Sequence, residues 1–158
     1  MPVSAPSTTQ ATDAPAGRLP LFHFVGFTGH RQLADPESTA TAIRGALSML
    51  RREVAGEWIA LSSVARGSDQ LFVREARAAG HSWQAILPLS RAEFARDFAA
   101  EEWRVVEEML ATADQVRVVH EYGDREDGYL DCGIETANDA DVLLAVWDGD
   151  RARGKGGT

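Results

Sequence analysis

Residues able to bind an anion gather at three points of the chain, each directly after a run of apolar residues. The first is Thr28-Gly29-His30-Arg31, and the second is Ala65-Arg66-Gly67-Ser68-Asp69. The third is divided between Asp148-Gly149 and the glycine-rich stretch Gly154-Lys155-Gly156-Gly157-Thr158. Arginine donates paired hydrogen bonds to phosphates and carboxylates, and glycine loops present backbone N–H groups to the same ligands. Because each loop follows a predicted strand, the three together predict one shared site at an edge of a parallel sheet.

Each loop also has a plainer structural interpretation. A strand-to-helix turn explains the first loop equally well, and hydrogen bonding to neighbouring backbone explains His30 at least as well as ligand contact. In the second loop, Ser68 or Asp69 is expected to cap the following helix, although Asp69 is alternatively placed to bind a ribose hydroxyl or orient Arg66. The third loop lacks the Walker A order and, taken alone, fits a flexible chain end better than a phosphate loop.

Several other side chains capable of chemistry are expected to be structural. The acidic residues of one predicted helix should form a solvated face: Glu101, Glu102, Glu107 and Glu108. The spacing of Asp124, Glu126 and Asp127 fits no metal-binding loop, so no metal site is predicted. A single cysteine, Cys132, excludes an internal disulfide and a cysteine-cluster zinc site.

The aromatic residues of the predicted strands are expected to lie in the core. These are Trp58, Trp83 and Trp147. Tyr129, near the start of a predicted helix, could stack on a base, but packing is the preferred interpretation.

Alternating strand-like and helix-like segments must position these loops. Strands are predicted at about 21–27, 57–62, 83–87, 115–119 and 141–147, with the third ended by Pro88. Helices are predicted at about 35–56, 68–80, 91–98, 100–113 and 128–140, the last with Leu130, Ile134 and Ala137 turned inward. This order predicts an α/β fold with a doubly wound, mostly parallel, Rossmann-like sheet of about five strands and helices on both faces.

Composition limits the classes of function. The 158 residues suit one domain, with 44% hydrophobic and 25% charged residues. The formal net charge is −8 and Lys155 is the only lysine, which argues against a broad nucleic-acid-binding face. No apolar run approaches the length of a membrane span and no signal-type segment begins the chain, so a cytoplasmic location without membrane attachment is predicted.

Two domain predictions follow from the same pattern. Residues 1–19 are rich in Ser, Thr, Ala and Pro and predict a disordered tail. Residues 20–158 predict a single nucleotide-binding domain. A helix normally follows a strand such as 141–147 in these folds, so the domain is interpreted as truncated at its C-terminus and as a fragment of a longer protein.

The set of loops resembles the SLOG superfamily of Rossmann-like nucleotide-ligand-binding proteins, which includes the DNA-processing protein A core and the Lonely-guy phosphoribohydrolases. The matching stretches are Gly26-Phe27-Thr28-Gly29-His30-Arg31, Ala65-Arg66-Gly67-Ser68-Asp69 and Gly156-Gly157-Thr158. The second resembles the Ala-Arg-Gly-x-Asp loop of the DNA-processing branch. The third is similar to a shortened Gly-Gly-x-Gly-Thr phosphate loop, without the preceding Pro or the following Glu of the hydrolases.

The resemblance implies a domain that binds a nucleotide or a nucleotide-derived ligand such as ADP-ribose, often as a sensor. Three functions therefore compete. The leading one is a binding module in which Thr28, Arg31, Arg66, Gly67 and the 154–158 loop hold the phosphate and ribose. The second is a hydrolase of a nucleotide N-glycosidic bond, for which Asp69, Asp148 or Glu135 would supply the carboxylate. The third is an oligomeric scaffold with a degenerate site. A homodimer and a fused or adjacent effector domain stay open, and no cofactor is assigned.

Overall fold

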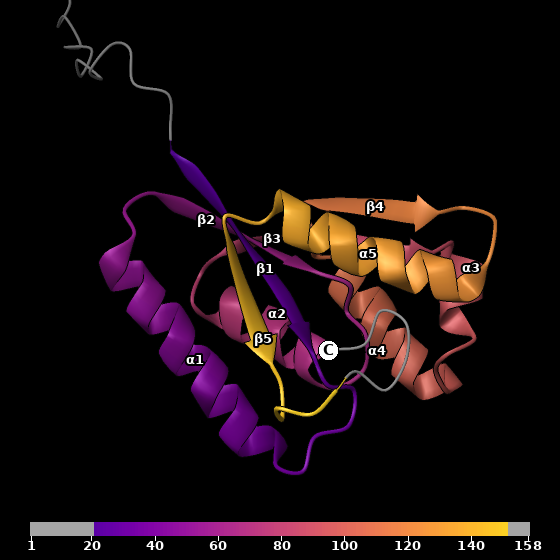
Figure 1. Cartoon of the computed structure of the whole chain (residues 1–158), viewed down its shortest axis with the longest axis horizontal. Helices are drawn as coiled ribbons and strands as arrows, with labels where there is room; N and C mark the ends of the chain where they lie inside the picture. The colour runs from indigo at the N-terminus through magenta and orange to yellow at the C-terminus, as the bar shows by residue number, and fades with distance from the viewer. Residues whose placement is uncertain (1–20, 152–158) are drawn as a thin grey trace, which may run out of the picture.

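The computed structural model describes residues 21–151, which form one parallel sheet with helices on both faces (Figure 1). Its strands are β1 (Phe22–Gly29), β2 (Glu57–Ser62), β3 (Ser82–Leu89), β4 (Gln115–His120) and β5 (Val142–Val146). They lie in the order β4-β3-β2-β1-β5, and every neighbouring pair is parallel. The predicted doubly wound α/β fold with a five-stranded sheet is confirmed.

The helices alternate with the strands. They are α1 (Pro36–Glu53), α2 (Ser68–Ala78), α3 (Arg91–Ala95), α4 (Ala100–Leu110) and α5 (Arg125–Asp139). Asp35 caps α1 by accepting a hydrogen bond from the N–H of Ser38, and Pro36 occupies its first turn. Gly80, with φ of 84°, follows the C-cap residue of α2 and ends that helix as predicted.

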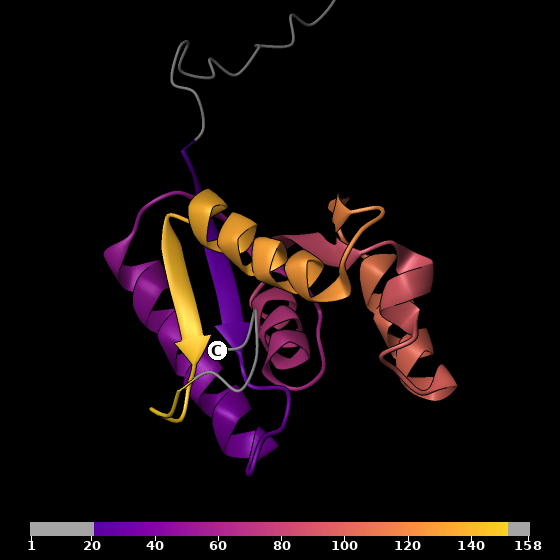
Figure 2. The same cartoon turned by 45° about the vertical axis from the view of Figure 1, so that its right-hand side comes forward.

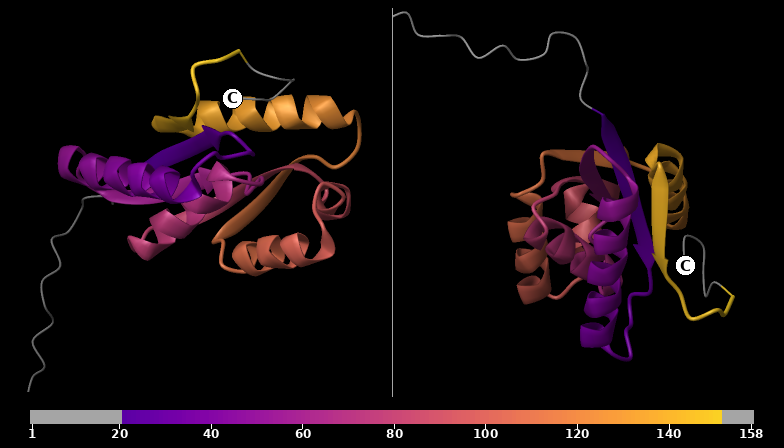
Figure 3. Two further views of the ribbon diagram at one scale, coloured as in Figure 1. Left: turned by 90° about the horizontal axis from the view of Figure 1, so that it is seen from below. Right: turned by 90° about the vertical axis from the view of Figure 1, so that its left-hand side faces the viewer.

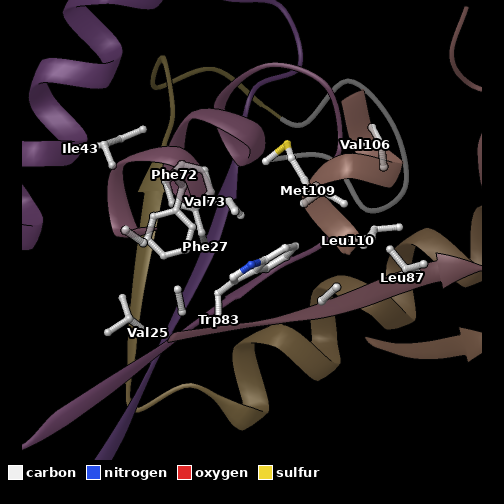
Figure 4. Close-up of a cluster of buried hydrophobic side chains, with 14 of the residues drawn as sticks. Val25, Phe27, Ile43, Phe72, Val73, Trp83, Leu87, Val106, Met109 and Leu110 are labelled. Atoms are coloured by element: carbon white, nitrogen blue, oxygen red, sulfur yellow. The ribbon is translucent and has the colours of Figure 1, made fainter. Parts of the chain in front are cut away.

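The larger core lies on the sheet face covered by α1, α2 and α4. Figure 4 shows Trp83 of β3 beneath Phe72, Met109 and Leu110, and the Phe27 and Phe72 rings stack with centroids 4.6 Å apart. The opposite face is covered by α5 alone among residues 21–151, over a small core of Leu61, Ile86 and Cys132 (Figure 3). Trp58 and Trp83 are buried, as predicted.

Two predicted strand ends are wrong. β1 continues to Gly29, so Thr28 and Gly29 belong to the strand and pair in register with Ala145 and Val146. β3 continues through Pro88 to Leu89. Proline is tolerated there because the pairing of β3 with β2 ends at Ala85, so one side of the strand no longer needs a ladder hydrogen bond.

The predicted inward face of the last helix is also wrong. Helix α5 begins at Arg125 rather than near 128, and Leu130, Ile134 and Ala137 are all exposed. Its buried residues are the small Gly128, Cys132 and Thr136. A Cβ at Gly128 would lie 2.7 Å from Leu89 Cδ2, so the helix approaches the sheet too closely for larger side chains.

The last described strand is not the buried strand that its apolar sequence suggests. β5 is at the edge of the sheet, and its residues alternate between half-buried and exposed. Trp147, predicted in the core, lies just beyond it with 59% of its surface exposed. An edge position depends on long-range strand order, which the local apolar run does not contain.

Part of the chain lies outside the described residues. The predicted N-terminal tail and the stretch from Gly154 to Thr158 belong to residues 1–20 and 152–158. Within residues 21–151, no helix combines the length and the apolar character needed to cross a membrane.

Candidate functional site

The strand order reverses direction at β1. From β1 the chain adds β2, β3 and β4 on one side, and β5 then returns to the other side of β1. Helix α1, which leaves β1, and helix α5, which leads into β5, lie on opposite faces of the sheet (Figures 2 and 3). In open parallel sheets the crevice outside the strand ends at such a switch point is the usual ligand site. The C-terminal ends of β1 and β5 therefore mark the candidate site.

His30 connects these two strand ends. Its backbone N–H donates to the carbonyl of Val146 at 3.2 Å, and the backbone N–H of Asp148 donates to His30 Nε2 at 3.1 Å. Asp148 Oδ1 lies 3.2 Å from the same Nε2. His30 is thus hydrogen-bonded to the neighbouring backbone, and its visible role is to join the two loops.

The loops after β1 and β2 are in direct contact. The Ser68 hydroxyl and backbone N–H both donate to the His30 carbonyl, at 3.0 and 3.1 Å. A Cβ at Gly29 would lie 2.2 Å from Ser68 Oγ, and one at Gly67 would lie 2.4 Å from the Arg31 carbonyl oxygen. Gly67 also has φ of 81°, which an L side chain rarely adopts. The hydrogen bonds of Ser68, together with the absence of side chains at Gly29 and Gly67, therefore hold the two loops together.

The second loop is organised around the buried carboxylate of Asp69. The Ser63 hydroxyl donates to Asp69 Oδ2 at 2.7 Å, and the backbone N–H groups of Ser63 and Ala65 also hydrogen-bond to this carboxylate. Burial nevertheless raises the pKa of Asp69 to about 7, against the lowering effects of these bonds and of Arg31. The backbone N–H groups of Ser63 and Ala65 are therefore occupied by a side chain of the same segment.

The expected capping role of Ser68 or Asp69 is wrong. Gly67 is the N-cap residue of α2, and the helix has no side-chain cap. Asp69 does not orient Arg66 either, because Arg66 donates to Glu102 Oε2 at 2.7 Å and lies over the Phe98 ring. The backbone N–H of Ser68, the first residue of α2, donates instead to the His30 carbonyl of the neighbouring loop.

Arg31 reaches across the edge of the sheet to the start of α5. Its guanidinium carbon lies 4.7 Å from the centroid of the Tyr129 ring, and among residues 21–151 Arg31 forms no ion pair. A guanidinium stacked on a ring keeps the donors along its edge available for a planar or tetrahedral anion. Arg31 is exposed, so such an anion could arrive from solvent.

The ring beneath Arg31 is held in place. The Tyr129 hydroxyl donates to Asp97, which also pairs with Arg125, and Arg125 donates to the Glu93 carbonyl at 3.0 Å. Burial, together with the hydrogen bond to Asp97, raises the pKa of Tyr129, so the phenol stays neutral. Tyr129 is therefore a packed platform for Arg31, in line with the packing interpretation.

The third loop begins as a tight turn. Asp148 Oδ1 accepts from the N–H of Asp150 at 2.9 Å, and Gly149 has φ of 88°. The Trp147 indole N–H donates to the Asp150 carbonyl at 2.6 Å. Asp148 and Gly149 thus lie at the switch point as predicted, whereas Gly156, Gly157 and Thr158 lie outside the described residues.

A hollow of about 250 Å³ adjoins the first two loops, between the start of α1 and α2. It is lined by Arg31, Leu33, Pro36, Gly67, Gln70, Leu71 and Arg74. The predicted site residues are therefore divided. Thr28, His30, Asp148 and Gly149 gather at the β1 and β5 ends, while Arg66 is turned toward α4.

Comparisons with known proteins add no assignment. The chain matches no protein-family model, and the curated proteins contain no match to it.

Proposed function

We propose that this domain binds a nucleotide or a nucleotide-derived ligand such as ADP-ribose at the C-terminal ends of β1 and β5, and that it acts as a sensor. The observation that best supports this proposal is the position of the Arg31 guanidinium, which stacks on the Tyr129 ring and forms no ion pair within residues 21–151. The switch-point position and the resemblance of the loops to the SLOG superfamily support the proposal.

In this proposal Arg31 binds the phosphate, and the rest of the ligand lies across the C-terminal ends of β1 and β5. Arg66 has a smaller role than the sequence suggests, because it would first have to leave Glu102. That ion pair is half-exposed, so breaking it costs at most about 1 kcal/mol.

The geometry favours binding over hydrolysis as a proposal. Each candidate carboxylate has a structural partner: Asp69 lies in its own loop, Asp148 near His30, and Glu135 lies 3.3 Å from Arg117. A hydrolase would need one of them directed at the sugar.

Isothermal titration of the whole chain with AMP, NAD and ADP-ribose tests the proposal. Arg31→Ala should weaken binding by about 1.5–3 kcal/mol, because it removes a charge-assisted contact. Arg104→Ala, which removes an exposed arginine of α4, is the matched control and should bind as the wild type does. No heat of binding with any of the three ligands at millimolar concentration would reject the proposal. Release of free base from AMP, faster than in buffer, would favour the hydrolase instead.

A further inference from the structure

The aromatic side chain at the switch point is mostly exposed. Trp147 directly follows β5, between Val146, which pairs with Gly29, and Asp148, which contacts His30. It is 59% exposed, whereas Trp58 and Trp83 are 4% and 1% exposed. A large apolar ring held in solvent beside a candidate ligand crevice is a feature that stacking on a ligand would explain.

The exposed ring is tethered. Its indole N–H donates to the Asp150 carbonyl, and the N–H of Asp150 in turn donates to the Asp148 side chain. Asp148 is tied to His30 at the end of β1. This chain of hydrogen bonds restricts the ring before any ligand arrives, which reduces the entropy lost on binding.

Trp147 and Arg31 follow the C-terminal ends of two neighbouring strands. Val146, the last residue of β5, pairs with Gly29, the last residue of β1, so Trp147 is one residue and Arg31 two residues beyond this pair. The His30 N–H donates to the Val146 carbonyl, which keeps the two segments side by side at this point. A ligand crossing the ends of β1 and β5 would therefore meet a cation and an aromatic ring.

We propose that Trp147 is the platform on which the nucleobase of the ligand stacks while Arg31 binds its phosphate. The inference rests on the proposed function and adds a division of the site into a base subsite and a phosphate subsite. An aromatic face stacks on any base, so the platform gives affinity for nucleotides over sugar phosphates rather than selection among bases.

Comparing a nucleotide with its baseless counterpart tests this division. AMP and ribose 5-phosphate are titrated into the whole chain, Trp147→Ala, Trp147→Phe and Tyr122→Ala. Trp147→Ala should lose roughly five- to 150-fold in affinity for AMP. It should bind ribose 5-phosphate as the wild type does, and Trp147→Phe should recover most of the loss. Tyr122, 93% exposed in the loop before α5, provides the matched control, and its removal should change neither affinity.

The outcomes separate the two proposals. Wild-type affinity of Trp147→Ala for AMP would overturn the platform and leave the proposed function standing. The same result with an altered oligomeric state would assign the ring to a protein contact. Equal losses for AMP and ribose 5-phosphate would also overturn it, because the ring would then act by supporting the loop. No binding of either ligand by the wild type, together with none of NAD and ADP-ribose, would remove the proposed function itself.

Discussion

At the scale of single residues, Asp69 is a carboxylate in a strongly perturbed environment. Its carboxylate is buried at the base of the β2–α2 loop and its pKa is raised to about 7. In the unfolded chain the same group titrates near 3.8. Between these two values the folded protein binds a proton that the unfolded chain does not, so raising the pH across this window lowers stability.

We expect the free energy of unfolding to depend on pH in this way. The stability of the wild type relative to Asp69→Asn should fall as the pH rises from about 4 to about 7, and then level off. Each tenfold difference in proton affinity contributes about 1.4 kcal/mol. Urea unfolding of both proteins at several pH values measures the difference. A difference that is constant across the window would show that Asp69 titrates normally in the fold.

At the scale of elements, the loops after β1 and β2 form one unit. Gly67 lies against the carbonyls of His30 and Arg31, and Ser68 donates twice to His30. Any residue with a Cβ at position 67 must therefore separate the loop that carries Arg31 from α2.

Gly67→Ala should destabilise the protein by about 1–3 kcal/mol, because the new Cβ meets backbone and the positive φ is strained. Gly45→Ala is the control, since a Cβ in the middle of α1 meets nothing within 4 Å. That change should stabilise by about 0.5–1 kcal/mol through helix propensity. Chemical denaturation reports both values, and similar effects for the two variants would contradict the close approach at position 67.

At the scale of the whole molecule, the site joins a central strand to an edge strand. β2 and β3 are mostly buried, whereas every residue of β5 is half-buried or exposed. Hydrogen exchange should therefore be slowest in β1–β3 and faster in β4 and β5, because edge strands open more readily. AMP should slow exchange in β5 if it bridges the two strand ends. Exchange in free β5 as slow as in β2 would refute this ranking.

The order of strands and helices is readable from the sequence because each element has its own apolar period and its own end signals, as at Asp35 and Gly80. The burial predicted for Trp147 and for the exposed face of α5 is wrong because not every apolar residue of a strand or helix points into the core. Close helix–sheet approach at Gly128 and the edge position of β5 depend on contacts far away in the chain. The sequence predicts which loops form the candidate site. It does not predict that the second loop donates hydrogen bonds to its own Asp69, or that Arg66 pairs with Glu102, because both contacts depend on the fold.

The bond between the backbone of Asp148 and His30 spans 118 residues. At a synthesis rate of roughly 5–20 residues per second, about 6 to 24 s pass between the synthesis of His30 and that of Asp148. During that time β1 has an open edge and no opposing loop, while β2 and β3 can already pair. The crevice is thus the last part of the described sheet to form on the ribosome, so a ligand held there would bind only chains in which β5 has already been made.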